Sequence, residues 1–386
     1  MKLGLAMGMQ NWGDWARFLA AERHENVPGR PAVSDHQIFN EDVALGLQAE
    51  PLGFDSIFVP EHHFTPYNLC TSPLQLMTYV AAKTERVDLG SMVVVLPWHQ
   101  PIRVAEQAIM LQNLMGPSRQ LHLGLGRGAA RREFAGFGID MAESRQRFKE
   151  SVDILKLAFT QDRFSYEGQH FKVAETEMRP SPINDRQLDY LYGVWGSAES
   201  APIIAEQGLK PFIIPQKSSE AFDLELRTFA EIRAANGYRP EPPLFSAWMY
   251  CAATEEEARE GALKYLPEYA QTPFLHYELG GAHFANVKGY ENYANGGRAS
   301  GTTIEDLTKD HGQTFIDNSV WGTPEQCFEK IKAIHAQWGV KHLILMARYG
   351  SMTIPTAQKS LDLFAKEVLP EARKLGRQAT PEQIFA

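Results

Sequence analysis

The stretch LGFDSIFVPEHHF, residues 52–64, joins a short apolar strand to a group of ionisable side chains. Its segment Ser56–Val59 is a brief run bounded by turn residues, which is typical of a strand buried on both faces. A helix that ends near Pro51 and a turn precede this run. The stretch therefore predicts one helix–strand unit of an α/β fold, with Glu61, His62 and His63 directly after the strand.

Seven further runs have the same character, and stretches of helical spacing separate them. These runs are Leu3–Met7, Val87–Leu96, Leu121–Leu125, Leu191–Trp195, Pro211–Ile214, Leu244–Cys251 and His342–Met346. Helical spacing is clearest in residues 141–159, where Phe148, Val152, Leu155 and Phe159 recur at intervals that fall on one face of a helix. The chain therefore alternates buried strands with helices.

Eight such alternations predict a (β/α)8 TIM barrel, because successive parallel strands need a helical crossover between them. The capping box Thr323–Gln326 opens one of these helices, which we expect to run toward Trp338. An open, doubly wound parallel sheet is the alternative arrangement of the same units.

Three segments exceed the bare strand–helix repeat: residues 11–36, 162–190 and 271–318. The second contains Tyr166–Phe171, which predicts a small hairpin. Insertions that follow barrel strands lie on the catalytic face, so we expect the first and third to form the rim or a lid. Without a repeat or a low-complexity linker, the sequence predicts a single elaborated domain over residues 1–386.

Composition narrows the class of protein. The chain has 386 residues, 44% of them hydrophobic, and a formal charge of −9, which excludes disorder and disfavours nucleic acid as a partner. Three cysteines without a CxxC pair predict a reduced, cytoplasmic setting with no disulfide framework. The run Met92–Trp98 is far shorter than the ~20 residues of a membrane span, so we expect no membrane partner.

Glu61, His62 and His63 would lie on the catalytic rim of a barrel, where two imidazoles and a carboxylate can move protons near neutral pH. The alternative is structural: one histidine hydrogen-bonds to the backbone and the other faces solvent. We expect no metal at this motif, because neighbouring side chains point apart and no third ligand follows at a spacing such as HExxH.

Two further strand ends predict a phosphate site. Gly124–Ala129 follows the fourth strand with three glycines and Arg127, which suits a bidentate contact to phosphate. Gly196–Ser200 follows the fifth strand and opens a helix from Ala201 to Gln207, where backbone N–H groups favour anions. Each motif alone is equally compatible with a glycine turn or an ordinary helix cap.

Together, these motifs resemble those of the bacterial luciferase-like monooxygenases, which are flavin-dependent (β/α)8 enzymes, and the catalytic luciferase subunit in particular. The resemblance covers nearly the whole chain. The stretches that carry it are LGFDSIFVPEHHF (52–64), LGSMVVVLPWHQPIRVAEQ (89–107), LHLGLGRGAARREFAGFG (121–138), GSAESAPIIAEQGL (196–209), KGYENY (288–293) and WGTPEQC (321–327).

The resemblance implies roles for individual residues. His62 matches the family's catalytic histidine, with Glu61 and His63 beside it, and Glu133 matches an acid of the luciferase fourth loop. A non-proline cis peptide would fall at Met92–Val93, under the flavin ring. The residues expected to bind the cofactor are Met92, Val93, Arg127, Ala129, Val194, Gly196, Ser197, Ala198, Glu199 and Ser200.

The sequence also departs from luciferase in three places. The reactive thiol position of luciferase is Gly126 here, and the acid before the phosphate-binding serine is Gly196. The insertion at residues 11–36 is not a luciferase feature. These departures put thiol sensitivity, aldehyde specificity and light emission in doubt.

The resemblance implies a two-component flavin-dependent monooxygenase. A separate NAD(P)H-flavin reductase would supply reduced FMN (FMNH2), and O2 would oxygenate a small organic substrate through a C4a-(hydro)peroxyflavin. The chain would act as a homodimer. Three alternatives remain: a deazaflavin (F420)-dependent dehydrogenase on the same fold, a non-catalytic partner like the luciferase β chain, and a barrel glycosidase or metal hydrolase.

Overall fold

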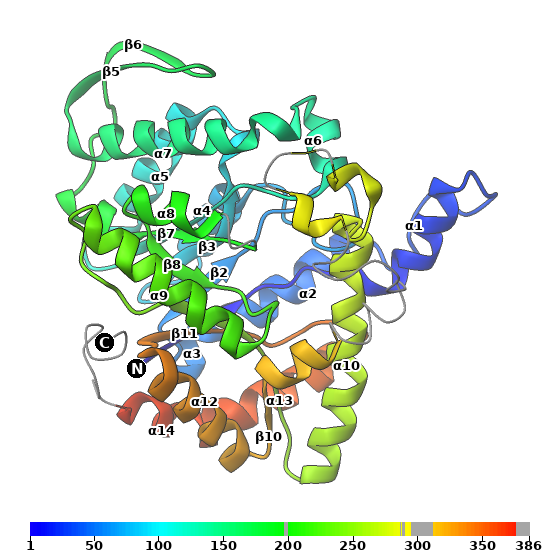
Figure 1. The fold of residues 1–386 in the computed structure, drawn as a ribbon. Coiled ribbons are helices and arrows are strands. Elements are labelled where there is room, and N and C mark those ends of the chain that lie inside the picture. The colour runs from blue at the N-terminus through cyan, green and yellow to red at the C-terminus, as the bar shows by residue number, and fades with distance from the viewer. Residues whose placement is uncertain (197–199, 286, 288–289, 295–311, 376–386) are drawn as a thin grey trace.

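The computed structural model describes residues 1–196, 200–285, 287, 290–294 and 312–375. Eight parallel strands close into a barrel, which confirms the predicted TIM-barrel fold (Figure 1). The strands are β1 (Lys2–Ala6), β2 (Ser56–Val59), β3 (Asp88–Val95), β4 (Leu121–Gly126), β7 (Leu191–Val194), β8 (Lys210–Ile213), β9 (Leu244–Cys251) and β11 (His342–Met346).

The pairing of β8 with β9 decides between the two topologies that the sequence allowed. Phe212 is opposite Leu244 and Ile213 is opposite Phe245, and this register closes a sheet that would otherwise be open. β1 lies between β11 and β2, and all barrel pairings are parallel. All eight predicted strands are present, and each of their ends lies within one residue of the prediction.

Each barrel strand is followed by a helix on the outside of the barrel. These helices are α2 (Asp35–Leu47), α4 (Pro73–Ala81), α5 (Pro101–Met115), α7 (Ser144–Thr160), α8 (Ser200–Glu206), α9 (Ser219–Ala235), α12 (Pro324–Trp338) and α13 (Ile354–Glu367). The predicted capping box is present at α12, where the side chains of Thr323 and Gln326 each accept the other's backbone N–H. The short strand β10 (Val320–Gly322) pairs with β9 and was not predicted.

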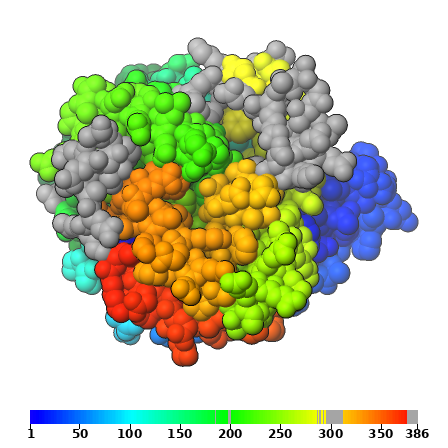
Figure 2. All heavy atoms as spheres, turned by 60° about the horizontal axis from the view of Figure 1, so that its bottom comes forward, coloured from blue at the N-terminus to red at the C-terminus, as the bar shows by residue number. Residues whose placement is uncertain are grey.

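The predicted extra segments lie outside this repeat. The hairpin is confirmed as β5 (Arg163–Glu167) and β6 (Lys172–Glu177). Residues 11–36 include α1 (Trp15–Glu22), which stands out from the side of the molecule (Figures 1 and 2). The third segment begins inside the long helix α10 (Glu255–Tyr277), and its residues 286, 288–289 and 295–311 lie outside the described residues. No helix in the described ranges has the length and apolarity to cross a membrane.

The barrel interior is filled by side chains, so it is a core and not a channel. Phe58 on β2 is fully buried and meets the rings of Phe212 and His342 with centroids 6.0 and 5.8 Å away. Gly90 on the neighbouring β3 provides the space, because a Cβ atom there would lie 2.3 Å from the Phe58 ring. Because this level of the barrel is filled, ligands are expected at the carboxyl ends of the strands.

This packing predicts that Gly90→Ala destabilises the fold. The added methyl group has to displace the buried ring of Phe58, and such overpacking costs about 1–3 kcal/mol. The free energy of unfolding in urea measures this loss. Gly29→Ala is the matched control, because a Cβ atom there meets nothing within 4 Å, and we expect it to change stability by less than about 0.5 kcal/mol. Equal stability of the two variants would contradict the packing account.

Candidate active site

A cavity opens at the carboxyl ends of the barrel strands. Including solvent at its mouth, it encloses about 1600 Å³ of empty space. Its walls include most of the residues predicted for the site: Glu61, His62, Met92, Val93, Arg127, Ala129, Val194, Gly196 and Ser200.

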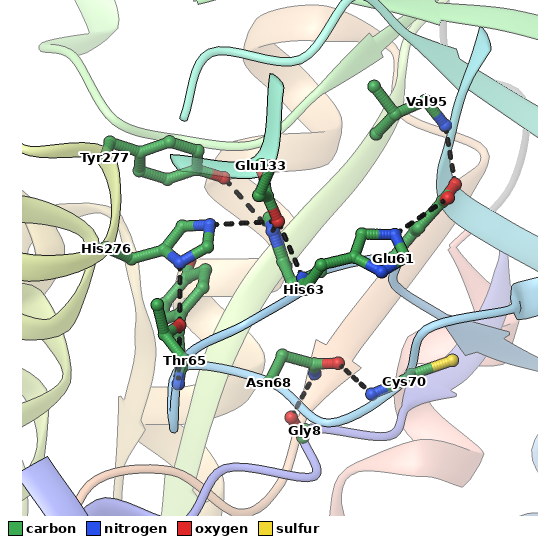
Figure 3. Close-up of polar contacts among 12 residues, drawn as sticks. Gly8, Glu61, His63, Thr65, Asn68, Cys70, Val95, Glu133, His276 and Tyr277 are labelled. Atoms are coloured by element: carbon green, nitrogen blue, oxygen red, sulfur yellow. Dashed lines mark hydrogen bonds and ion pairs between the residues drawn. The ribbon is translucent and has the colours of Figure 1, made fainter. Parts of the chain in front are cut away.

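The carboxylate of Glu133, on α6 (Arg131–Phe137), is the centre of a cluster of ionisable side chains at the cavity (Figure 3). Its Oε1 atom accepts the backbone N–H of His63 at 2.7 Å. The Nδ1 atom of His62 and the Nε2 atom of His276 each lie 3.3 Å from the same oxygen. Burial alone would raise the pKa of Glu133, but its contacts with His276 and then with His62 lower the pKa to about 2. The carboxylate is therefore ionised at neutral pH.

His62 is held between this carboxylate and a tyrosine of α10. Its backbone N–H donates to the carbonyl of Cys70, which fixes the loop after β2. Its Nδ1 faces Glu133, and its Nε2 lies 3.4 Å from the hydroxyl of Tyr277. Burial and the charge of Glu133 raise the pKa of Tyr277, so the phenol keeps its proton. This arrangement favours the proton of His62 on Nδ1 and leaves Nε2 as an acceptor.

Glu61 and His63 belong to a second cluster of hydrogen bonds. The carboxylate of Glu61 accepts the backbone N–H of Val95 at 2.7 Å and contacts the Nε2 atoms of His99 at 2.7 Å and His63 at 3.2 Å. Burial acts to raise the pKa of Glu61, and the hydrogen bonds from both histidines outweigh it, so the pKa is lowered. The imidazole of His63 packs against Phe137 and lies outside the cavity wall in the described part of the chain. Glu61 therefore forms part of the cavity wall and fixes the end of β3, whereas His63 lies behind the wall.

The cavity wall also contains two positively charged side chains. Arg127 after β4 and Arg145 on α7 both line it, together with Ser200 at the start of α8. The guanidinium of Arg127 lies over the ring of Tyr290, 4.1 Å from its centroid, and the Tyr290 hydroxyl donates to the carbonyl of Gly128 at 2.7 Å. Two arginines and a hydroxyl form a suitable binding site for a phosphate group. The predicted residues Ser197, Ala198 and Glu199 lie outside the described residues.

The peptide bond from Met92 to Val93 is cis, as the resemblance implied. Gly126 of β4 passes directly beside it, and a Cβ atom at Gly126 would lie 2.4 Å from the Val93 side chain. Glycine is therefore required at Gly126 for the close approach of the two strand ends.

Sequence reasoning missed several residues of this site, above all His276, Tyr277 and Arg145. His276 and Tyr277 come from the end of α10, more than a hundred residues after the motif that they contact. Arg145 belongs to α7, and the sequence pattern of this helix indicated only its apolar face. One signal was available for Arg145: it stands at the start of a helix that follows the glycine-rich turn containing Arg127.

The chain belongs to the luciferase-like monooxygenase family, whose profile matches residues 21–342. It is 28% identical to the alkanal monooxygenase alpha chain of the Kryptophanaron alfredi symbiont over 184 residues, which are 48% of this chain and 50% of that protein. The chain thus matches about half the length of this relative. It is 26% identical to limonene 1,2-monooxygenase of Rhodococcus erythropolis over 92% of this chain and 86% of that protein.

Solved structures share the fold at lower identity. The oxygenating constituent of 3,6-diketocamphane monooxygenase from Pseudomonas putida, in complex with FMN, superposes with a TM-score of 0.68 at 20% identity, covering 96% of this chain and 98% of that one. An F420-dependent secondary alcohol dehydrogenase superposes with a TM-score of 0.64 at 15% identity, covering 97% and 99%. Structural relatives thus bind either FMN or F420.

The burial of the cysteines predicts that the native protein resists thiol reagents. Cys70, Cys251 and Cys327 are all buried, and burial raises the pKa of the Cys70 thiol to about 12. We expect a chromogenic disulfide reagent to react slowly with the folded protein and to titrate three thiols rapidly in urea. A thiol that reacts as fast in the folded as in the unfolded protein would contradict this burial.

Proposed function

We propose that this chain is the oxygenating component of a two-component flavin-dependent monooxygenase. It would take FMNH2 from a separate NAD(P)H-flavin reductase and use O2 to oxygenate a small organic substrate. The observation that carries the proposal is that one cavity is lined both by two arginines and by His62, which is held on an ionised Glu133. The family membership of the chain supports the same activity.

The residues of the cavity fit FMN. Arg127, Arg145 and Ser200 would hold its phosphate. At Gly196 the backbone itself forms the cavity wall. A Cβ atom there would lie 2.2 Å from the hydroxyl of Tyr293, so a larger residue would not fit. Backbone exposed in this way can approach a planar ligand closely.

Bound FMNH2 supplies the activation of O2, which no protein side chain provides. The side chains of this chain supply proton control. His62 can accept or return a proton at Nε2, because Glu133 holds Nδ1 and stabilises the charge that then forms on the ring. Tyr277, with its proton retained, provides a hydrogen-bond donor beside that nitrogen.

The wall near His62 is aromatic and would exclude water. Tyr67, Trp248, Tyr269 and Tyr349 line it and are buried. The hydroxyls of Tyr67 and Tyr269 bond to each other at 2.9 Å, which leaves ring faces and edges for a substrate. Such a wall fits an apolar organic molecule and protects reactive species from hydrolysis.

A deazaflavin-dependent dehydrogenase is the second candidate. The structural likeness to the F420-dependent secondary alcohol dehydrogenase supports it, because that enzyme has the same fold. A role as a non-catalytic partner subunit fits less well, since His62 and its carboxylate are both in place.

The substitution Arg127→Ala tests whether the arginine side of the cavity binds the cofactor. A charged hydrogen bond contributes roughly 1.5–3 kcal/mol, so we expect the affinity for FMNH2 to fall about 10- to 100-fold. Anaerobic titration followed by flavin absorbance measures this change. Arg103→Ala, on the exposed face of α5, is the control and should bind FMNH2 normally. Unchanged affinity in Arg127→Ala would remove the phosphate assignment.

Mixing the anaerobic protein–FMNH2 complex with air-saturated buffer tests the reaction. We expect a transient absorbance band that appears before the spectrum of oxidised FMN. A compound that is a substrate should change the decay rate of this band, and an alkanal, limonene and a camphane ketone are the probes. His62→Gln should bind FMNH2 as the wild type does but lose coupled turnover by about 10²- to 10⁴-fold. Failure to bind FMNH2, together with tight binding of oxidised F420 and turnover without O2, would establish the dehydrogenase instead.

A further inference from the structure

We propose that His62, Glu133 and His276 form a binding site for a divalent transition metal of the Zn²⁺ class. The three residues each offer one ligand atom, and these atoms all lie within 4.8 Å of one another. They come from the loop after β2, from α6 and from the end of α10, so only the folded chain brings them together. The sequence analysis predicted no metal at the motif Glu61–His63, because no third ligand follows it at a recognisable spacing.

The distances agree with the geometry of a zinc site. The carboxylate oxygen of Glu133 lies 3.3 Å from Nδ1 of His62 and 3.3 Å from Nε2 of His276. A tetrahedral ion with bonds of about 2.0–2.1 Å has ligand atoms about 3.3–3.4 Å apart. For two direct hydrogen bonds between an imidazole and a carboxylate, 3.3 Å is long. These two distances therefore match the spacing of ligand atoms around a tetrahedral ion, and the third pair of ligand atoms lies within 4.8 Å.

Two buried ligand atoms are free of hydrogen bonds in the described part of the chain: Oε2 of Glu133 and Nε2 of His276. Both side chains are fully buried. The Nε2 atom of His276 points at the carboxylate (Figure 3) without making a hydrogen bond to it. Buried polar atoms are rarely left without a partner. An ion held by Nε2 of His276 and by both carboxylate oxygens of Glu133 would give each of these two atoms a partner.

The neighbours of the ligands hold them in the orientation that a metal needs. The hydroxyl of Thr65 lies 2.8 Å from Nδ1 of His276 and also accepts the backbone N–H of Tyr67, which turns Nε2 toward Glu133. The backbone N–H of His63 fixes the carboxylate in turn. Ligand histidines in metal sites have such partners on the second ring nitrogen.

The site has an access path and one open position. His62 and Glu133 form part of the cavity wall, whereas His276 lies behind it. Two histidines and one glutamate leave a fourth coordination position that faces the cavity, where water can bind. If the proposed function holds, a metal on Nδ1 of His62 prevents Glu133 from pairing with that nitrogen, so Zn²⁺ inhibits turnover.

Binding is tested on the chelator-treated, flavin-free protein, so that the result does not depend on the proposed function. We expect equilibrium dialysis to find one Zn²⁺ per chain and Co²⁺ to give the visible absorption bands of a low-coordinate site. His276→Ala should weaken Zn²⁺ binding at least 100-fold. Thr65→Val, which removes the hydroxyl partner only, should weaken it about 10- to 100-fold. His36→Ala, an exposed histidine on α2, is the control and should bind Zn²⁺ normally.

Several outcomes would overturn the site. Wild-type protein that binds no Zn²⁺ would do so, as would binding that His276→Ala leaves unchanged while His36→Ala removes it. If His276→Ala does not fold, Thr65→Val decides, and normal affinity in that variant overturns the site. Reversible inhibition of turnover by Zn²⁺ in the wild type, with resistance in Thr65→Val, would add support, whereas loss of monooxygenase activity alone would leave the binding result untouched.

Discussion

A carboxylate that is fully removed from water and still ionised has to be surrounded by donors, and the catalytic face of this barrel is arranged around one such group. An uncompensated buried charge is among the most costly defects in a protein. Glu133 avoids that cost through the backbone N–H of His63, the hydrogen bond with His62 and the contact with the His276 ring at 3.3 Å. Because these groups belong to distant parts of the chain, the same carboxylate joins the loop after β2 to the end of α10.

A second buried carboxylate explains why two histidines follow each other in the motif. Consecutive residues after a strand point in opposite directions, so His62 turns to Glu133 and the cavity while His63 turns to Glu61. Glu61 in turn holds the end of β3 through the N–H of Val95. The motif therefore serves two carboxylates, one that controls a proton in the cavity and one that fixes the strand end below it.

The sequence was sufficient for the fold because local signals and tertiary structure agree. Ser56–Val59 and its seven counterparts are buried strands in a parallel barrel, and their apolar character follows directly from that burial. The glycines near Arg127 were visible for the same reason, since close approach of the backbone requires them. Residues whose role depends on long-range contacts could not be predicted from local sequence patterns. His276 lies inside a helix with ordinary neighbours, and only the position of α10 brings it to Glu133.

This difference in origin divides the cavity into two chemical parts. The charged part is formed by Arg127, Arg145 and Ser200, which follow β4 and β7 and are fixed by the barrel itself. The aromatic part depends on α10, which contributes Tyr269 and Tyr277 and belongs to the crossover between β9 and β11. A change in that crossover can reshape the wall around a substrate while the strand ends around a phosphate stay in place. Under the proposed function, the part fixed by the strand ends would bind the cofactor and the part formed by α10 would contact the substrate. Glu133 joins α10 to the loop after β2 through its contacts with His276, His62 and His63.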